Sequence, residues 1–454
     1  MKESCQTGLT RAASTGRGSL AAWPGNAPDL GTEPCDPPPF FRIAHPELPH
    51  ATNRPASTAA RISRAAAAGK NGKKYFLSDT EQIRFTTSPP NERIFFGAIS
   101  GIMPDYDGLA EPFLDQNTHG KLRTELERFR RALAAARQRL PSACLAPETI
   151  CVAADDAQLH LAMAPGGTIN LTILGVIHGN ETGGLPVIAS LIEKILEGEV
   201  TVTRPVAFGL GNVPAALAGK RFLDRDLNRS FGGASLGSSH EGTRARELQE
   251  LLGRSLYLVD LHQTREPSET PFFIFPFARR SFDFARMISS DLPVVTHWSG
   301  SFSQDGMCTD EYVNSRGGTG LTIELGQAGF EEAQMSTGLA SALRALHVTG
   351  SANVRELPRI EIDAGFKGCV YTWAGTIPYP KSGEVRLVPD LVNFQMLNAG
   401  DVIGTWDGSA IKMPASGRIL FPKYVRPGTP DADAPRPAEL CRVIRIVTEP
   451  ELPA

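Results

Sequence analysis

The chain has 454 residues, enough for two or three domains around a well-buried core. A composition of 41% hydrophobic and 21% charged residues is that of a soluble globular protein, and a net charge of −3 gives no general attraction to nucleic acid or to an anionic membrane. No apolar run reaches the roughly 18 residues of a membrane-spanning helix, and seven scattered cysteines without a C-x-x-C pair argue against a disulfide framework and favour a reducing compartment, the cytoplasm.

Residues 1–75 are rich in Ala, Pro, Ser, Gly and Arg, and no strand or helix period persists in them. Such a composition buries too little apolar surface to fold, so we expect a disordered, low-complexity extension. It lacks the apolar core of a secretory signal and has more acidic residues than a transit peptide. A linker, or a start codon placed too early with Met103 as an alternative start, explains it better than targeting.

An amphipathic helix is predicted from Lys121 to Leu140, within an N-terminal segment that we place at residues 76–140. Its apolar side chains recur at helical spacing on one face: Leu122, Leu126, Phe129, Leu133 and Leu140. The other face is rich in arginine. Because no aromatic or basic continuation follows, we interpret that face as solvated rather than as a nucleic-acid surface.

Residues 141–353 alternate between predicted strands and predicted helices. The strand candidates are Ile169–Ile177, Val206–Leu210, Leu256–Leu261, Val294–Thr296 and Gly320–Leu325. The helix candidates are Leu185–Leu196, Thr243–Leu252, Ala278–Ile288 and Ala333–His347. This alternation predicts an α/β domain with a mainly parallel sheet covered on both faces. Neither GxGxxG after the first strand nor GxxxxGK[ST] is present, which excludes the dinucleotide and P-loop classes.

The pattern changes from about Leu357. Short alternating stretches are separated by Gly, Pro and Asn, and no long helical pattern appears: Cys369–Trp373, Glu384–Val388 and Arg442–Val447. Residues 354–454 are therefore predicted to form a small all-β domain.

Two of the predicted strands are followed by potential metal ligands. His178 and Glu181 come directly after the first strand of the α/β region, and His262 ends the strand Leu256–Leu261. Ligands bind beyond the carboxyl ends of strands in open α/β sheets, so the three side chains can reach one crevice. Two imidazoles and one carboxylate make the His₂Glu set of a catalytic zinc site. The alternatives are a polar turn with Glu181 near a helix N-terminus and a satisfied core histidine at position 262.

Asp260 and Gln263 flank His262 and are candidates to hold its imidazole.

The segment Gly219–Gly233, GKRFLDRDLNRSFGG, combines charged side chains with apolar anchors. The anchors expected there are Phe222, Leu223, Leu227 and Phe231, and the polar candidates are Arg221, Arg225, Asn228 and Arg229. A guanidinium matches a carboxylate bidentately, so the segment suits a clamp for an anionic substrate. A solvated loop with internal Asp–Arg pairs is the alternative.

Glu324 lies inside the apolar strand Gly320–Leu325, where a carboxylate is expensive to bury unless it is paired or used. A partly desolvated Glu has a raised pKa and can act as a general base near neutral pH. A strand-end Glu bonded to a loop is the alternative.

Together these pieces resemble the succinylglutamate desuccinylase/aspartoacylase family, which belongs with the zinc carboxypeptidase-like fold. The matching motifs are HGNE with His178 and Glu181, RFLDRDLNR from Arg221 to Arg229, DLH with His262, and IELG with Glu324. The resemblance covers about Leu171 to Phe330 and extends to the C-terminal region only in outline. It implies a mixed sheet flanked by helices.

The resemblance also implies a role for each matching residue. His178, Glu181 and His262 would hold one zinc ion per chain, and Glu324 would activate water on it. Arg221 would polarise the scissile carbonyl, while Asn228 and Arg229 would bind the carboxylate of the substrate.

The family uses a further arginine shortly before the base, for which Arg316 is the candidate. The tyrosine that the family supplies from its C-terminal domain has no assignable counterpart, which leaves the acyl specificity open.

The expected reaction is zinc-dependent hydrolysis of a small anionic N-acyl amino acid, such as N-succinylglutamate or N-acetylaspartate, with no nucleic-acid or membrane partner. The sequence leaves open whether the chain forms a homo-oligomer. The alternatives are a zinc carboxypeptidase acting on short peptides and a non-catalytic zinc-binding protein. RFLDRDLNR favours the deacylase over the peptidase.

Overall fold

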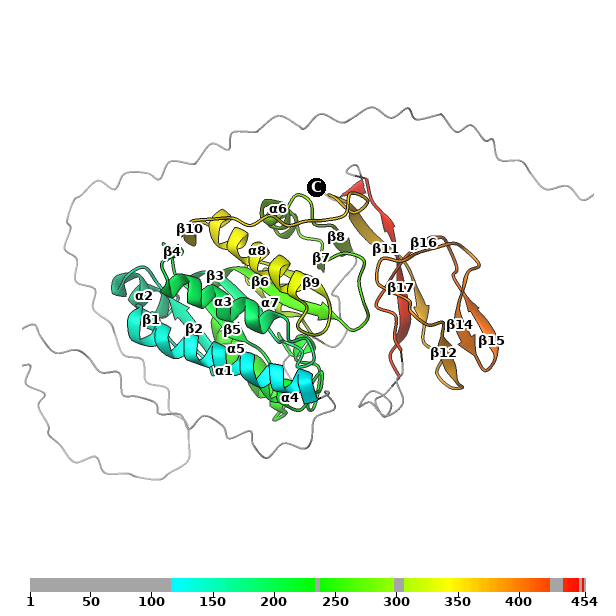
Figure 1. Cartoon of the computed structure of the whole chain (residues 1–454), viewed down its shortest axis with the longest axis horizontal. Helices are drawn as coiled ribbons and strands as arrows, with labels where there is room; N and C mark the ends of the chain where they lie inside the picture. The colour runs from blue at the N-terminus through cyan, green and yellow to red at the C-terminus, as the bar shows by residue number, and fades with distance from the viewer. Residues whose placement is uncertain (1–115, 233–236, 298–305, 425–435, 449–450, 453–454) are drawn as a thin grey trace, which may run out of the picture. The chain divides into compact units, whose positions relative to one another are not determined.

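The computed structural model describes residues 116–232, 237–297, 306–424, 436–448 and 451–452 (Figure 1). The predicted disordered extension, residues 1–75, and the first part of the predicted N-terminal segment, 76–115 with Met103, lie outside the described residues.

Twelve described strands form one sheet. Eight of them precede residue 355: β1 (Ser142–Ala143), β2 (Thr149–Val152), β3 (Ile169–Gly175), β5 (Val206–Leu210), β6 (Ser255–Thr264), β7 (Phe272–Pro276), β8 (Val294–His297) and β9 (Thr319–Gln327). The other four are β11 (Val370–Pro378), β13 (Met396–Leu397), β16 (Gly417–Leu420) and β17 (Glu439–Ile446). Their order is β1-β2-β5-β3-β6-β9-β7-β8-β11-β17-β16-β13. Two smaller sheets pair β10 (Ala352–Val354) with β4 (Val200–Val202), and β12 (Val385–Leu387) with β14 (Val402–Trp406) and β15 (Ser409–Lys412).

The sheet is mixed, which confirms the mixed sheet implied by the family resemblance and corrects the expectation of a mainly parallel sheet. Strands β5, β3, β6 and β9 are parallel neighbours, but β2 runs antiparallel to β5 and β7 runs antiparallel to β9. The pattern of strands alternating with helices had missed β2 and β7. Both are short apolar runs of four and five residues, and the antiparallel pairs that they make need no crossover helix.

Helices cover both faces of the sheet. They are α1 (Gln116–Arg139), α2 (Asp156–Met163), α3 (Gly184–Leu196), α4 (Val213–Leu217), α5 (His240–Leu252), α6 (Arg279–Ile288), α7 (Thr309–Ser315) and α8 (Glu332–Val348). Side chains of α1, α3, α4, α6 and α8 share the larger apolar core, whereas α5 and α7 share the smaller one on the other face. Figure 1 shows α1, α3 and α8 in front of the strands, with α3 packed between the other two. None of the described helices is both long and apolar enough to span a membrane.

The alternation of side chains along β6 and β9 places polar residues on one face of the sheet and apolar residues on the other. On β6, Val259 and Leu261 belong to the larger core, while Asp260 and His262 alternate with them and point to the face of α5 and α7. On β9, Ile323 lies in the larger core, and the next residue, Glu324, takes the opposite face. One face of two neighbouring strands is thus apolar, and the other carries polar side chains at the carboxyl ends.

The C-terminal strands continue the same sheet and core. From residue 355 to residue 448 every regular element that the structure describes is a strand. β11 pairs in parallel with β8 through Val370–Val294 and Tyr371–Val295. The ring of Phe394 lies 4.9 Å from that of Phe272, centroid to centroid, and both belong to the larger core. The two parts of the chain are therefore joined by backbone hydrogen bonds and by apolar packing.

Candidate active site

The candidate residues lie at the carboxyl ends of three adjacent parallel strands, β3, β6 and β9. His262 of β6 is the direct partner of Glu324 of β9 in the strand register, so the two side chains stand next to each other on one face of the sheet. His178 follows β3, the strand on the other side of β6. Three chain segments separated by more than 60 residues thus converge at one end of the sheet.

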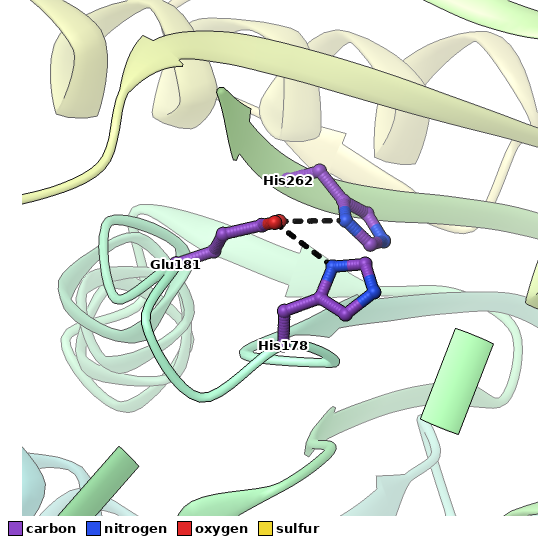
Figure 2. A group of neighbouring side chains, drawn as sticks. All are labelled: His178, Glu181 and His262. Atoms are coloured by element: carbon purple, nitrogen blue, oxygen red, sulfur yellow. Dashed lines mark hydrogen bonds and ion pairs between the residues drawn. The ribbon is translucent and has the colours of Figure 1, made fainter. Parts of the chain in front are cut away.

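His178, Glu181 and His262 form a compact buried cluster (Figure 2). The Nδ1 atom of His262 lies 2.8 Å from Glu181 Oε2, and the Nδ1 atom of His178 lies 2.9 Å from Glu181 Oε1. The two imidazole rings are 4.9 Å apart and meet edge to face. One ligand atom from each side chain lies within 4.8 Å of the other two, which is close enough for all three to contact one ion. The sequence prediction that these residues converge is confirmed.

The outer nitrogen of each imidazole is held by a carboxylate. Asp226 Oδ1 lies 3.0 Å from His178 Nε2, and Asp260 Oδ2 lies 3.0 Å from His262 Nε2. Thr309 donates its hydroxyl to the same oxygen of Asp260. A carboxylate on the distal nitrogen orients the ring and makes the other nitrogen a better metal ligand. The expectation that Asp260 supports His262 is confirmed, and Asp226 plays the equivalent part for His178.

The donor chemistry of the cluster fits a divalent metal ion. His178 Nδ1 is buried without a hydrogen-bond partner, although it is close to Glu181, because the geometry of that contact is not that of a hydrogen bond. Asp226 Oδ1 and the Nη2 atom of Arg221, at 3.0 and 2.7 Å, both contact His178 Nε2, and in the tautomer whose Nε2–H donates to Asp226 the Nδ1 lone pair is available to a metal. Burial alone would raise the pKa of Glu181, but His178 and His262 hold it well below its usual range. The carboxylate is therefore ionised, as a ligand must be.

Backbone geometry before His178 shapes the turn that carries it. Val176 is buried and adopts φ 58°, a left-handed conformation that is unusual for a β-branched residue. Its carbonyl accepts from the N–H of Asn212 at 2.7 Å. A Cβ on Gly179 would come within 2.4 Å of the backbone of Ala215, so only glycine fits there. The turn after β3 therefore packs closely against the segment that follows β5, and this packing fixes the position of His178.

Gln263 does not hold His262, and this part of the sequence prediction was wrong. Its side-chain oxygen accepts from the N–H of Gly183 at 2.7 Å, and its Nε2 donates to the carbonyl of Gln327 at 3.0 Å. Successive residues of a strand point to opposite faces, so Gln263 cannot share the face of His262. It ties the turn after β3 to the end of β9 instead.

Glu324 is a buried carboxyl group beside the cluster. Its side chain is 9% exposed, and its Oε2 atom is buried with no hydrogen-bond partner among the described residues. Burial raises the pKa of Glu324 to about 8, and the nearby charge of Glu181 adds to the shift. A carboxyl group with a free oxygen and a pKa near neutrality can both take up and release a proton.

Arg221 reaches the cluster from a separate loop. Its guanidinium donates to Glu181 Oε1 at 2.7 Å and lies 3.4 Å from Asp226 Oδ2. Burial would lower the pKa of Arg221, but the charges of Asp226 and Glu181 raise it. A permanent cation is thus fixed at the edge of the site.

The loop that carries Arg221 is organised by one carboxylate. Glu241, in the first turn of α5, is fully buried and accepts from the backbone N–H groups of Leu223, Asp224 and Arg225 at 2.6, 3.0 and 3.2 Å. It also accepts from the side chain of Asn212 at 3.0 Å. Four donors therefore depend on this single side chain.

We expect Glu241→Ala to lower the free energy of unfolding by roughly 3 kcal/mol, because it leaves the buried amide of Asn212 and three part-buried backbone donors without their acceptor. Urea denaturation measures this loss. Trypsin should also cleave after Arg225 faster in the variant, as read by mass spectrometry. Glu250→Ala, on the exposed side of the same helix, is the matched control and should change neither result. Wild-type stability in Glu241→Ala would contradict the role of Glu241.

Asn228 and Arg229 lie in the short 3₁₀ turn Leu227–Arg229, which Asp226 caps by accepting from the N–H of Asn228 at 2.8 Å. The side-chain oxygen of Asn228 accepts from the N–H of Thr309 at 3.0 Å, which leaves its amide NH₂ group for a ligand. Arg229 donates to the carbonyl of Asn228 at 2.7 Å. Both side chains line the same cavity as the cluster.

Of the four expected loop anchors, Leu227 and Phe231 are fully buried. Phe222 is 36% exposed and lines the cavity, so it is not an anchor. Leu223 is half-buried.

Arg316 lies away from the site, which corrects its assignment as a substrate-binding residue. It follows α7 and precedes β9, so it lies at the amino end of the strand that carries Glu324 near its carboxyl end. It is exposed, and its guanidinium lies 5.6 Å from the ring of Tyr312. Order along the chain placed it near Glu324, but five residues of extended strand span about 16 Å.

A cavity of about 500 Å³ connects the cluster with the C-terminal strands. The C-terminal part of the chain contributes eight lining residues: Asn393, Phe421, Pro422, Lys423, Tyr424, Pro437, Glu439 and Arg442. Apolar and aromatic side chains form much of the remaining wall. The cavity can therefore hold a small molecule with apolar parts and several anionic groups.

Several residues with functional contacts were missed by the sequence analysis. Asp226 and Glu241 carry no spacing signal, because their contacts depend on how the loop 219–232 folds. Asp310 also lines the cavity, and burial raises its pKa to about 7. Lys423 lies between Pro422 and Tyr424 in a segment without a recognisable pattern.

Comparisons with known proteins agree with this arrangement. Residues 168–348 match the family model described as the succinylglutamate desuccinylase/aspartoacylase catalytic domain. A succinylglutamate desuccinylase of Serratia proteamaculans is 28% identical over 305 residues, which cover 61% of this chain and 89% of that protein. One of Pseudomonas paraeruginosa is 30% identical over 205 residues, 40% of this chain and 60% of that protein.

A solved structure of a succinylglutamate desuccinylase/aspartoacylase from Rhodobacter sphaeroides has a TM-score of 0.50 to this chain. It is 18% identical and covers 66% of this chain and 89% of its own, and the likeness concerns the fold alone.

Proposed function

We propose that the protein is a zinc-dependent amide hydrolase that releases an amino acid from an N-acyl amino acid, because residues 168–348 match the succinylglutamate desuccinylase/aspartoacylase family model. The named relatives are succinylglutamate desuccinylases, and the arginine and lysine side chains that line the partly apolar cavity offer partners for the carboxylates of such a substrate. We also propose that the fold is of the zinc carboxypeptidase type, since the ligand set lies at strand ends of a mixed sheet.

His178, Glu181 and His262 would hold the zinc ion, with Asp226 and Asp260 fixing the two imidazoles. When bound, zinc lowers the pKa of water and polarises a carbonyl group. The protein then has to position the substrate, move protons and stabilise the negative charge that develops on the carbonyl oxygen.

Glu324 is the proposed proton carrier. Its unpartnered Oε2 atom takes a proton from the attacking water and then delivers it to the leaving amine. The raised pKa of Glu324 suits both steps, because a carboxylate of ordinary pKa would take up the proton too weakly.

Two loop segments bind the substrate. Arg221, a half-buried and permanently charged donor next to Glu181, stabilises the oxyanion of the tetrahedral intermediate. The amide of Asn228 and the guanidinium of Arg229 bind the α-carboxylate of the amino acid.

The observation that carries this proposal is the pairing of His262 with Glu324 on neighbouring strands, directly beside Glu181. It brings a potential ligand set and a potential base together. A structural histidine would not need an adjacent carboxyl group that is buried and has a free oxygen.

The test is metal analysis of the purified protein, together with amine release from a panel of acetyl-, succinyl- and other acyl-amino acids. We expect about one zinc ion per chain and turnover of at least one member of the panel. Dipeptides belong in the same panel. Faster release from them would favour a carboxypeptidase, and bound zinc without any hydrolysis would favour a non-catalytic zinc protein.

A further inference from the structure

One buried threonine is hydrogen-bonded to two different parts of the candidate active site. Thr309, the first residue of α7, is fully buried and does not line the cavity. Its backbone N–H donates to Asn228 Oδ1 at 3.0 Å. Its hydroxyl donates to Asp260 Oδ2, the same oxygen that lies 3.0 Å from His262 Nε2. Thr309 thus contacts a proposed substrate-binding residue and the carboxylate that supports a proposed metal ligand.

The segment that precedes Thr309 is fastened to the loop that carries Asn228. The N–H of Met307 donates to the carbonyl of Phe231 at 3.0 Å, and the N–H of Phe231 donates to the carbonyl of Met307 at 3.3 Å. Phe231 is fully buried, so this pair of hydrogen bonds lies away from water. Backbone contacts therefore hold Thr309 beside Asn228, in addition to the hydrogen bond between the two residues.

Asp260 depends on Thr309 for part of its own support. It is fully buried, and its Oδ1 atom has no hydrogen-bond partner among the described residues. Its Oδ2 atom is contacted by His262 and by the hydroxyl of Thr309. A carboxylate orients a ligating imidazole only as firmly as the carboxylate itself is held. Without that hydroxyl, His262 would be the one described hydrogen-bond partner of Asp260.

The backbone N–H of Thr309 determines which end of the Asn228 amide faces the cavity. An amide side chain has an oxygen that accepts and an NH₂ group that donates. Because the oxygen accepts from Thr309, the NH₂ group is left for the cavity that Asn228 lines. Turning the amide over would place the NH₂ group against the N–H of Thr309, where two donors repel each other. The cavity is therefore offered a donor, which a carboxylate requires.

We propose that Thr309 is a positioning residue with two separable roles. Its hydroxyl orients Asp260, and through it His262, for the metal. Its backbone N–H orients Asn228 for the carboxylate of the substrate. The inference rests on the proposed function, but the first role is measured by metal binding and needs no turnover.

The first experiment removes the hydroxyl and keeps the N–H. Thr309→Val preserves the volume of the side chain, and we expect it to weaken zinc affinity by about tenfold, measured by competition with a chelator. At saturating zinc, its KM for N-succinylglutamate should change by less than about twofold, because Asn228 keeps its partner. Thr309→Ser retains a hydroxyl and should restore most of the zinc affinity.

The second experiment removes the N–H as well. Proline is tolerated at the first position of a helix, and Cys308 already has the extended backbone that a residue before proline prefers, with φ −72° and ψ 169°. We expect Thr309→Pro to lose as much zinc affinity as Thr309→Val and also to raise KM about tenfold, the effect of one hydrogen bond to a charged group. Asn228→Asp tests the same contact without changing the helix. It replaces the NH₂ group by an oxygen and should raise KM at least as much.

A double variant tests whether the hydroxyl acts through Asp260. Adding Thr309→Val to Asp260→Ala should cost less than about twofold in zinc affinity, because the acceptor of the hydroxyl is already gone. Thr349→Val is the matched control. It removes a hydroxyl that donates to the carbonyl of Ala345 at 2.7 Å at the end of α8, and it should change neither zinc affinity nor KM.

Wild-type zinc affinity in Thr309→Val, or an undiminished loss in the Asp260→Ala background, would overturn the role of the hydroxyl. Wild-type KM in Thr309→Pro or in Asn228→Asp would overturn the role of the N–H. A wild-type protein that binds zinc but hydrolyses no N-acyl amino acid would overturn the proposed function together with the second role, while zinc affinity still decides the first. A wild-type protein without zinc affinity would overturn both roles.

Discussion

Replacing Glu324 by Gln is expected to lower kcat by about 10²–10⁴ while zinc content stays at the wild-type level. The amide has nearly the same shape as the carboxyl group but cannot take up a proton. Glu324 stands beside His262 through the strand register, and among the described residues it makes no hydrogen bond or ion pair to the three proposed ligands. The measurement is amine release at saturating substrate, with metal content determined on the same preparation.

The stability of the Glu324→Gln variant provides a further check. A buried carboxyl group with a pKa of about 8 is costly to ionise, so a neutral amide should not destabilise the fold. Glu356→Gln makes the same change at an exposed position and is the matched control, with wild-type stability and turnover expected. Loss of zinc together with activity would make Glu324 a ligand rather than a base, and wild-type turnover would remove it from the mechanism.

Replacing His178 by Ala is expected to abolish both zinc binding and turnover. Of the three proposed ligands, His178 is the one with a ring nitrogen that is buried without a hydrogen-bond partner and so is available to a metal. Inductively coupled plasma mass spectrometry measures the metal, and thermal unfolding in the presence of chelator verifies that the fold persists.

A variant of the residue that supports His178, and a variant of a distant histidine, provide the comparisons. Asp226→Asn keeps an oxygen near the imidazole but removes the charge that supports it and that pairs with Arg221, so it should weaken zinc affinity by roughly 10–100-fold, less than His178→Ala does. His160→Ala, at an exposed position in α2, should leave zinc and turnover unchanged. Full zinc occupancy in His178→Ala under dialysis would refute the assignment of His178 as a ligand.

The central strands and the convergence of the site follow from local pattern. An apolar run that ends in a polar residue predicts a buried strand, and it places the polar side chain at the carboxyl end of that strand. The runs before His178 and His262 are of this kind. Glu324 follows from the same reasoning, since a carboxylate alternates with apolar residues on β9. These features depend on periodicity within a few residues, which the sequence contains directly.

Contacts between distant segments do not follow from local pattern. Arg316 is eight residues before Glu324, but the strand between them separates the two side chains along the sheet. Gln263 is adjacent to His262 yet belongs to the other face. Lys423 reaches the cavity only because β8 and β11 pair, a long-range register that no short motif encodes.

The shared core of the larger sheet has a practical consequence for shortened versions of this protein. A chain that ends before β11 would leave β8 as an exposed edge strand, whose unpaired backbone groups can pair with another molecule and promote aggregation. It would also strip Tyr371 and Phe394 from the packing around Phe272, exposing aromatic surface to water. Expression of residues 116–354 alone should therefore yield insoluble material, even though every proposed zinc ligand and the proposed base would still be encoded.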